Sequence, residues 1–378
     1  MKIFYRRYEV VNRLTRENVP VIYASNHQNA LMDALNASVW TSPKRQPLFM
    51  TRADVFNSRF DKFLRGVKML PIYRTRDGLD SVRMNTEIFE RVVEELSHSN
   101  GCMIIFPEGN HNRRYQLRPL QKGLARMAFQ TAEKWAFKEP VWVIPVGQYY
   151  KNHLKVRSDF LLEYGEPIDI SAYYELYQES PPKAYLRLNQ DLAAAMKDVM
   201  IHISLDDTYE LTEQVRQIAT RHTVARMGLN KNALDSELQA GKKLVQTVED
   251  HITAKDPLLP ELAELVPKYS QELKNLRLRD HVVENYPYNL LGLIVQKLLL
   301  LAGLPVHLYA VVNHVIPHEI ARRVTESKFA DDHFHTSVKF VMAMVLFPLF
   351  YLLQTLIVSL FTDGWATLIY FISLPVSG

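Results

Sequence analysis

The sequence predicts an α/β fold, with a largely parallel sheet flanked by helices, followed by a helical region and C-terminal transmembrane helices. Between Val19 and about Ile170, short apolar stretches alternate with helical patterns, as in α/β domains. Farther along, apolar residues recur at helical spacing, and the last part of the chain contains runs long enough to cross a bilayer. We therefore expect an α/β domain at 1–175, a helical region at 176–286, and a membrane region with two or three hydrophobic segments at 287–378.

The composition limits the class of protein without identifying it. The chain of 378 residues is long for one domain, and 47% hydrophobic residues are enough for a sizeable core. The net charge of +4 is compatible with phosphate or anionic lipid ligands. The single cysteine, Cys102, excludes an intrachain disulfide, and its apolar surroundings predict a buried, unreactive thiol. Because Met1–Val11 has no apolar run typical of a signal peptide, we expect the soluble part to face the cytoplasm.

Each element of the α/β domain is predicted by its own pattern. Short runs rich in apolar and β-branched residues predict strands at Val19–Tyr23, Pro47–Thr51, Cys102–Phe106, Val141–Val146 and Phe160–Tyr164. Apolar residues at helical spacing predict helices at Leu31–Trp40, Leu79–Leu96 and Leu120–Ala136. Sheets of this class bind ligands at the carboxyl ends of their strands, so we expect functional side chains in the loops that follow.

The first such loop is Ala24–Asp33, which contains His27 and Asp33. A neutral imidazole takes up a proton near neutral pH, and a carboxylate on its other nitrogen fixes the tautomer. On one continuous helix the two side chains would be rotated about 240° apart. We therefore expect His27 in the loop and Asp33 in the first turn of the following helix, where the helix dipole favours a carboxylate. The alternative is an ordinary surface histidine.

The second candidate segment is Gly66–Arg74, followed by Thr75 and Arg76. Pro71 stiffens this segment because its ring fixes its own φ. The guanidinium groups of Arg74 and Arg76 could each bind a phosphate with two parallel hydrogen bonds. The alternative is an edge strand with alternating charged residues.

The third candidate segment follows the strand that ends at Phe106. Gly109 permits a tight turn, and Glu108 could accept hydrogen bonds from substrate hydroxyls or from its own loop. Arg113 and Lys122 add positive charge, and Lys122 opens a helix whose N-terminal amides suit an anion. A second possible base, His111, ranks below His27 because it has no acidic neighbour in sequence.

Four motifs therefore occur in order: Asn26-His27…Asp33, Gly66…Pro71-Ile-Tyr-Arg74, Phe106-Pro-Glu-Gly109 and Val143-Ile-Pro145. Together they resemble the motifs of the glycerolipid acyltransferase family, which includes glycerol-3-phosphate and 1-acylglycerol-3-phosphate acyltransferases. One position departs from the usual pattern, because His27 and Asp33 are separated by five residues where the family usually has one fewer. Some fungal acyltransferases acting on glycerol-3-phosphate or dihydroxyacetone phosphate have the longer spacing, so the departure leaves the acceptor open.

The resemblance implies a role for each matching residue. His27 would deprotonate the acceptor hydroxyl, which attacks an acyl thioester, and Asp33 would orient His27. Arg74 would hold the acceptor phosphate, and Glu108 with Gly109 would position the glycerol backbone. Further substrate contacts are expected from the remaining cations of these segments, namely Arg76, Arg113 and Lys122. The expected donor is acyl-CoA or acyl carrier protein, with no other cofactor, no metal and no nucleic acid.

Beyond the α/β domain, helices are predicted at Asp206–Val224, Asn232–Ala254 and Pro257–Leu278. We expect a bundle packed on the α/β domain, with a lid over the acyl chain or a dimer contact as alternatives. Phe340–Phe361 is long and apolar enough to cross a bilayer, whereas the comparable Leu290–Val312 contains Gln296, Lys297 and His307. The third run, Trp365–Val376, is expected to be a re-entrant or interfacial segment, or the start of a third span.

These observations predict a membrane-bound O-acyltransferase of phospholipid biosynthesis, a transferase of lipid metabolism that works at the bilayer on a glycerophosphate or lysophospholipid acceptor. Two other classes stay open. One is a hydrolase that uses His27 and Asp33 to activate water. The other is a non-catalytic lipid-binding or scaffold protein, which would follow if the extra residue between His27 and Asp33 displaced the carboxylate.

Overall fold

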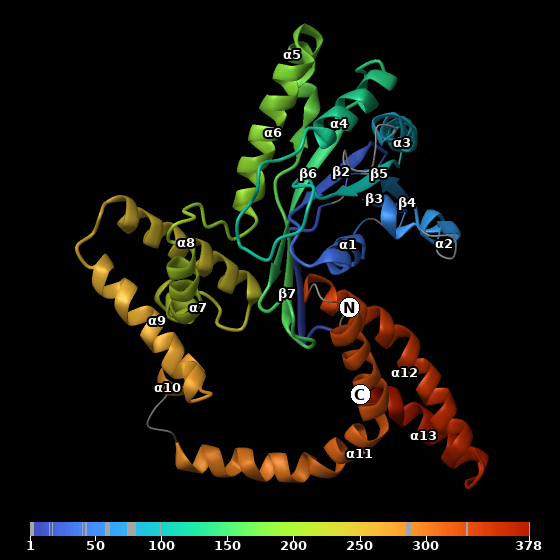
Figure 1. Ribbon diagram of the computed structural model, residues 1–378, viewed down its shortest axis with the longest axis vertical. Coiled ribbons are helices and arrows are strands. Elements are labelled where there is room, and N and C mark those ends of the chain that lie inside the picture. Colours follow the sequence, from blue (N-terminus) through green and yellow to red (C-terminus); the bar gives the residue numbers. More distant parts are fainter. Residues whose placement is uncertain are drawn as a thin grey trace. The chain divides into compact units, whose positions relative to one another are not determined.

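The computed structural model describes residues 4–14, 16, 18–39, 41, 44–56, 61–73, 81–98, 100–284, 289–329 and 332–377. The chain forms two compact units, a first unit at Met1–Ala263 and a second unit at Glu264–Gly378 (Figure 1). The first unit contains the sheet and the second contains long apolar helices. The functional boundaries expected near residues 175 and 286 stay predictions.

The first unit is built on an eight-stranded sheet whose main path runs in the order β1-β7-β6-β2-β5-β3-β4, with the short β8 beside β6. The pairing is parallel except where β6 meets β7 and β8. The predicted α/β fold with a largely parallel sheet is therefore confirmed. The strands are β1 Arg7–Val11, β2 Val21–Ser25, β3 Leu48–Arg52, β4 Met69–Ile72, β5 Cys102–Ile105, β6 Trp142–Tyr150, β7 Asp159–Tyr164 and β8 Ile168–Asp169.

Strand β4 lies at one edge of the sheet, within the second candidate segment. It pairs only through β3 at the end of the main path, and it contains Pro71 opposite Thr51. Proline has no N–H to donate, so it is tolerated more readily at the edge of a sheet than in its middle. Met69–Ile72 is thus an edge strand, but it contains no charged residue, so the predicted alternation of charges is not tested by it. Arg74 and Arg76 lie outside the described residues.

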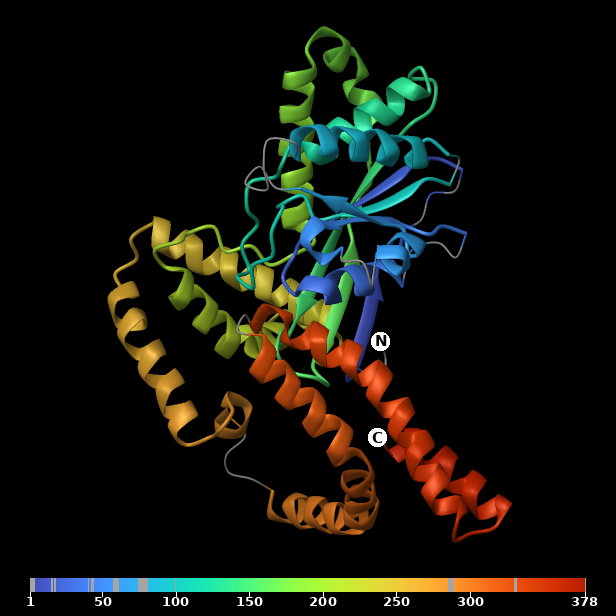
Figure 2. The ribbon, with the colours of Figure 1, turned by 45° about the vertical axis from the view of Figure 1, so that its right-hand side comes forward.

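Helices cover both faces of the sheet (Figure 2). The bounds are α1 Ala30–Ser38, α2 Asp61–Gly66, α3 Ser81–Leu96, α4 Gly123–Lys134, α5 Tyr174–Glu179, α6 Pro181–Asp198, α7 Tyr209–Arg226 and α8 Leu234–Thr253. The main core packs α3, α4 and α6 against residues such as Ile22 of β2 and Met103 of β5. Helix α1 lies on the opposite face, as Figure 2 shows.

The helical region begins with a pair that packs on the sheet. Leu234, Leu238 and Val245 of α8 share a buried cluster with Tyr149 of β6 and Leu161 of β7. For α7 and α8, this contact confirms the prediction that the helical region packs against the α/β domain. Helix α9, Leu259–Asn275, follows the predicted apolar stripe, and none of its residues is buried.

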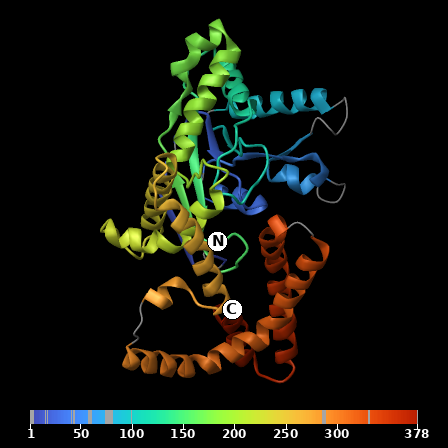
Figure 3. The same cartoon turned by 60° about the vertical axis from the view of Figure 1, so that its left-hand side comes forward.

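The second unit consists of α10 Asp280–Glu284, α11 Leu290–Lys328, α12 His335–Ser359 and α13 Gly364–Ser377. The last three pack on one another as the orange and red helices of Figure 3. Helices α11 and α12 are both long and apolar enough to cross a membrane, and none of the apolar window of either is buried. Helix α11 is bent along its length (Figure 2) and contains Pro305 and Pro317, the residue type that most often kinks a helix.

A group of polar side chains joins α11, α12 and α13, and we call it the tail network: Asn313, His314, Tyr351, Gln354 and Tyr370. Pro317 cannot donate to the carbonyl four residues earlier, and Gln354 Nε2 donates to that carbonyl, Asn313 O, at 2.8 Å. Tyr370 OH donates to Asn313 Oδ1 at 2.6 Å. Polar contacts of this kind hold apolar helices together where the surroundings supply no other partner.

Candidate functional site

The candidate site lies where β2 ends, in the middle of the sheet. Strand β2 is paired with β5 on one side and with β6 on the other, all three parallel. Three chain segments therefore leave the same edge of the sheet together, namely the β2–α1 loop, the loop after β5 and the end of β6. This is the edge at which sheets of this class bind ligands. His27 lies in the β2–α1 loop, and Asp33 lies in the first turn of α1, as predicted.

His27 and Asp33 form a close pair. The distance between His27 Nδ1 and Asp33 Oδ2 is 2.7 Å, and the carboxylate side chain is fully buried. The same oxygen accepts the backbone N–H groups of Gln28 at 2.8 Å and Asn29 at 2.7 Å. Because a carboxylate only accepts, Nδ1 carries the proton in this pair. The lone pair of the neutral imidazole is therefore on Nε2.

The extra residue between His27 and Asp33 does not displace the carboxylate. The backbone turns sharply at the start of α1, where its first residue, Ala30, has a φ of 45° in the left-handed region. This conformation is uncommon for a residue other than glycine. It belongs to the loop whose two amides, from Gln28 and Asn29, converge on Asp33. A non-catalytic scaffold was expected only if the extra residue moved the carboxylate away from His27, and it does not.

The His27 ring is partly exposed and is held on its flat side. It stacks on Phe106 with 4.1 Å between ring centroids and 14° between planes. The His111 ring lies nearly perpendicular to it, with 5.4 Å between ring centroids and 80° between planes. The side chain retains 17% exposure, and among the described residues no hydrogen-bond partner is recorded for Nε2. A buried carboxylate thus orients an imidazole whose second nitrogen remains available to a substrate.

The loop after β5 holds the backbone of His27 on both sides. Glu108 Oε1 accepts His27 N–H at 3.1 Å, and Asn112 N–H donates to His27 O at 2.9 Å. The other oxygen of Glu108 accepts Arg118 N–H at 3.1 Å. Burial raises the pKa of Glu108, and the two backbone hydrogen bonds oppose that shift. Of the two interpretations offered for Glu108, the contacts favour hydrogen bonding to its own loop and to His27.

The other predicted residues are placed as follows. Gly109 is exposed and has a φ of 74°, which explains the glycine at this turn. Arg113 is half-buried in the same loop, and Lys122 is exposed at the N-terminus of α4, which it opens as expected. Cys102 is buried in β5, and burial raises the pKa of its thiol to about 12, consistent with an unreactive group.

Sequence reasoning missed the polar side chains at the end of β6. Gln148 N–H donates to Asn26 Oδ1 at 2.7 Å, and Asn26 Nδ2 donates to Gln148 O at 3.0 Å. Tyr150 OH reaches Asp33 Oδ1 at 2.6 Å. The predicted strand ended at Val146, four residues short of the observed end, so these side chains were not considered.

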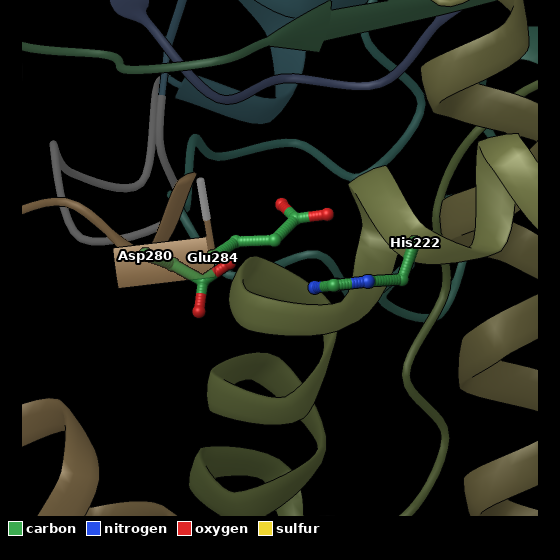
Figure 4. Close-up of side chains that lie close together, drawn as sticks. All are labelled: His222, Asp280 and Glu284. Atoms are coloured by element: carbon green, nitrogen blue, oxygen red, sulfur yellow. The ribbon is translucent and has the colours of Figure 1, made fainter. Parts of the chain in front are cut away.

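Side chains of the type that bind metal ions occur elsewhere, as Figure 4 shows. His222 extends from α7 in the first unit, and Asp280 and Glu284 extend from α10 in the second unit. Within the second unit, Tyr269 OH donates to Asp280 Oδ1 at 2.7 Å, so that carboxylate already has a protein partner. We assign no metal ion to these residues.

Comparison with known proteins gives the class. Residues 4–148, which span β1 to β6 and include His27, Asp33 and Glu108, match the acyltransferase family model. The first unit therefore contains an acyltransferase domain, and the predicted resemblance to glycerolipid acyltransferases is confirmed.

Particular relatives come from yeast. The chain is 30% identical over 200 residues to glycerol-3-phosphate O-acyltransferase 2 of Saccharomyces cerevisiae, covering 53% of this chain and 26% of the relative. It is 27% identical over 213 residues to glycerol-3-phosphate O-acyltransferase 1 of the same yeast, covering 55% and 27%. The matched region thus spans about a quarter of each yeast protein. The crystal structure of the 1-acyl-sn-glycerophosphate acyltransferase PlsC from Thermotoga maritima aligns with a TM-score of 0.35 and 14% identity, over 51% of this chain and 72% of that one.

Proposed function

We propose that the protein transfers a fatty acyl group from an acyl thioester to a hydroxyl of glycerol-3-phosphate or 1-acylglycerol-3-phosphate, with His27 as the general base. The observation that carries the proposal is the buried Asp33 carboxylate 2.7 Å from Nδ1 of a partly exposed histidine. The family match and the names of the two yeast relatives support this reaction class. In this proposal the reaction takes place at the carboxyl edge of β2.

The chemical step follows from the tautomer of His27. Nε2 accepts the proton of the acceptor hydroxyl while its oxygen attacks the thioester carbonyl carbon, which becomes tetrahedral. The carbon–sulfur bond then breaks, the ester remains on the acceptor, and the thiolate takes the proton back from Nε2. A positioned base of this kind contributes about 10²–10⁴ in rate. The remaining acceleration comes from alignment of the two bound substrates.

Asp33 has two functions in this proposal. It keeps the proton on Nδ1, so that Nε2 is the basic nitrogen, and it stabilises the imidazolium that forms during the step. Neither function requires Asp33 to take the proton. The full burial of its carboxylate strengthens the interaction, because water does not screen it.

Acceptor binding is proposed for the residues that follow the edge and central strands. Arg74 and Arg76 would bind the phosphate, since a guanidinium group matches two phosphate oxygens at once. Arg113 and Lys122 would add positive charge near the substrate, with Gly109 leaving room at the turn. Glu108 would act on the acceptor indirectly, because its two oxygens already accept N–H groups of His27 and Arg118.

The donor and the location complete the proposal. Acyl-CoA or acyl carrier protein would supply the acyl group as a substrate, with no further cofactor. Insertion of α11 and α12 in a bilayer would hold the first unit at the surface where acyl chains and lipid acceptors reside, with the cytoplasmic face as the proposed side. The exposed apolar surface of these helices supports this arrangement.

The test is an acyl-transfer assay on the purified full chain in detergent, with labelled acyl-CoA and separate acceptors. Glycerol-3-phosphate and 1-acylglycerol-3-phosphate should be acylated faster than glycerol, the unphosphorylated control. Release of free fatty acid with no transfer to any acceptor would instead identify the hydrolase. If neither product forms from acyl-CoA or acyl carrier protein, the chain is not a catalyst of this class.

A further inference from the structure

The carboxylate of Asp33 is held by more than the histidine and the two loop amides. Those three groups all donate to Oδ2, whereas Oδ1 accepts the hydroxyl of Tyr150 at 2.6 Å. We propose that Tyr150 is a positioning residue of the acyl-transfer site, which orients the carboxylate and sets how strongly it attracts the proton of His27. This inference rests on the proposed function, since it assigns Tyr150 a role in the same reaction.

The direction of the Tyr150 hydrogen bond follows from its neighbours. Asn36 Nδ2, which can only donate, lies 2.9 Å from the Tyr150 hydroxyl oxygen. The hydroxyl oxygen therefore accepts a hydrogen bond from Asn36, and the hydroxyl donates its own hydrogen bond to another group. Three acceptors are within reach: Gln148 Oε1 at 3.3 Å, Asp33 Oδ1 at 2.6 Å, and the hydroxyl of Tyr5, which also accepts from Asn36. The carboxylate is the only charged one of the three, so it is the strongest acceptor. The proton of Tyr150 accordingly points at Asp33.

The Tyr150 hydroxyl also keeps its proton. Burial raises the pKa of Tyr150 well above its ordinary value, and the negative charge of Asp33 raises it further. The ring is fixed by Phe160, whose centroid lies 4.8 Å away at 61° between planes. Tyr150 is 1% exposed, so no solvent competes for the carboxylate. The hydroxyl is thus a permanent donor in a fixed direction.

Apart from His27 when it is protonated, the groups of the described residues that donate hydrogen bonds to the Asp33 carboxylate are uncharged. Among the described residues they are the amides of Gln28 and Asn29 and the hydroxyl of Tyr150. A buried carboxylate with no cation beside it depends on each of its hydrogen bonds, because an unsatisfied buried acceptor is costly. Removing the Tyr150 hydroxyl would leave Oδ1 without its donor. The carboxylate would then attract the proton of the His27 imidazolium more strongly.

Strand β6 connects this contact to the rest of the site. Gln148, two residues before Tyr150, hydrogen-bonds with Asn26, the residue before His27. The side-chain Nε2 of Gln148 also donates to Ser25 Oγ at 3.0 Å and to the backbone carbonyl of Asp33 at 3.2 Å. The end of β6 therefore holds the chain on both sides of the His27–Asp33 pair. A single strand, more than a hundred residues later in sequence, aligns the base and its orienting group.

The test compares Tyr150→Phe with the wild type in the full-length protein, measuring kcat, both KM values and the pH dependence of the rate. We expect kcat to fall about ten- to a hundred-fold, the value of a hydrogen bond to a charged group. Both KM values should stay near those of the wild type. The acid side of the rate profile should move to higher pH, because protonated His27 persists there. Among the residues that the structure describes, Glu108 and His111 are the other ionisable groups in contact with His27, and Tyr5 packs against Tyr150; all three are unchanged in the variant.

A matched control is Tyr149→Phe. Tyr149 is the preceding residue of β6 and is also buried, but it packs with Leu161 and Leu234 in the cluster on α8. This variant removes a buried hydroxyl from the same strand and should leave the pH profile in place. Equal loss in the two variants with no movement of the profile would mean that Tyr150 only supports folding, and would overturn the inference.

A second variant serves if Tyr150→Phe does not fold. Asn36→Ala keeps the Tyr150 hydroxyl and removes the donor that polarises it, so the acid side should move in the same direction by a smaller amount. An unmoved profile in this variant would overturn the inference. If the wild type transfers no acyl group, the proposed function fails first. If the wild type is active and Tyr150→Phe matches it in kcat and pH profile, only the role of Tyr150 fails.

Discussion

Two histidine networks, one in each unit, differ in a way that indicates which is suited to catalysis. In the tail network, both ring nitrogens of His314 have protein partners: Nδ1 lies 2.6 Å from Ala310 O, and Nε2 lies 3.0 Å from Tyr351 OH. Nε2 is also 3.1 Å from Leu374 O. In the first unit, His27 contacts Asp33 through Nδ1, and its side chain is 17% exposed.

The charge of the two networks also differs. Asp33 brings a carboxylate into the first network, whereas the partners of His314 are carbonyl and hydroxyl groups. A carboxylate can stabilise an imidazolium, and neutral groups do so far less. Burial of a histidine in a polar network is therefore not enough to indicate catalysis. An available nitrogen and a fixed carboxylate together are the better indication, and the predictions below test this distinction.

The largest effect is expected when the carboxylate of the first network becomes an amide. Asp33→Asn should reduce acyl transfer by about 10²–10⁴, because an amide can donate to Nδ1 and so place the proton on the wrong nitrogen. The rate is measured at saturating substrate, with circular dichroism to confirm folding.

The control for this variant uses another pair in the same chain. His251 Nδ1 lies 2.7 Å from Asp256 Oδ2 on α8 and the following turn, and the imidazole is 56% exposed. Asp256→Asn should leave transfer unchanged. An equal fall in both variants would show that the burial of Asp33 is not what distinguishes the pair.

The smallest effect is expected in the tail network. Gln354→Leu removes the donor to Asn313 O, the carbonyl that Pro317 leaves without a helical N–H. The cost should be about 0.6 kcal/mol of unfolding free energy, the average for polar contacts between membrane helices. Thermal unfolding in detergent measures it, with Gln296→Leu at an exposed position of α11 as the control. A large loss of transfer rate at unchanged stability would give the tail network a catalytic role and remove the contrast.

Much of the fold could be predicted because the relevant patterns are local. The apolar runs around Ile22, Met103 and Val143 identify the central strands, which are buried on both faces. The pattern around His27 identifies the loop and first turn at the site. Helix α6 was missed although Ala184, Leu188, Leu192 and Met196 recur every four residues along its buried face. That helix was within reach of the same argument.

Other features depend on distant parts of the chain. Strand β1 has no buried residue and includes Arg7 and Glu9, so it lacks an apolar run. Its place in the sheet depends on pairing with β7, roughly 150 residues later, where Asp159 accepts hydrogen bonds from Arg6 and Arg7. Tyr150 reads in the sequence as one more aromatic residue beyond the predicted strand. Its contact with Asp33 exists only because β6 lies beside β2.

The measurement that tests the central claim most directly is the rate of acyl transfer to glycerol-3-phosphate by His27→Ala. We expect transfer to fall by at least about 10²-fold, with normal folding, because the variant removes the base from a loop and not from the core. His251→Ala, which removes an imidazole from the exposed pair, should keep the wild-type rate. A folded His27→Ala protein that transfers acyl groups at close to the wild-type rate would contradict the account.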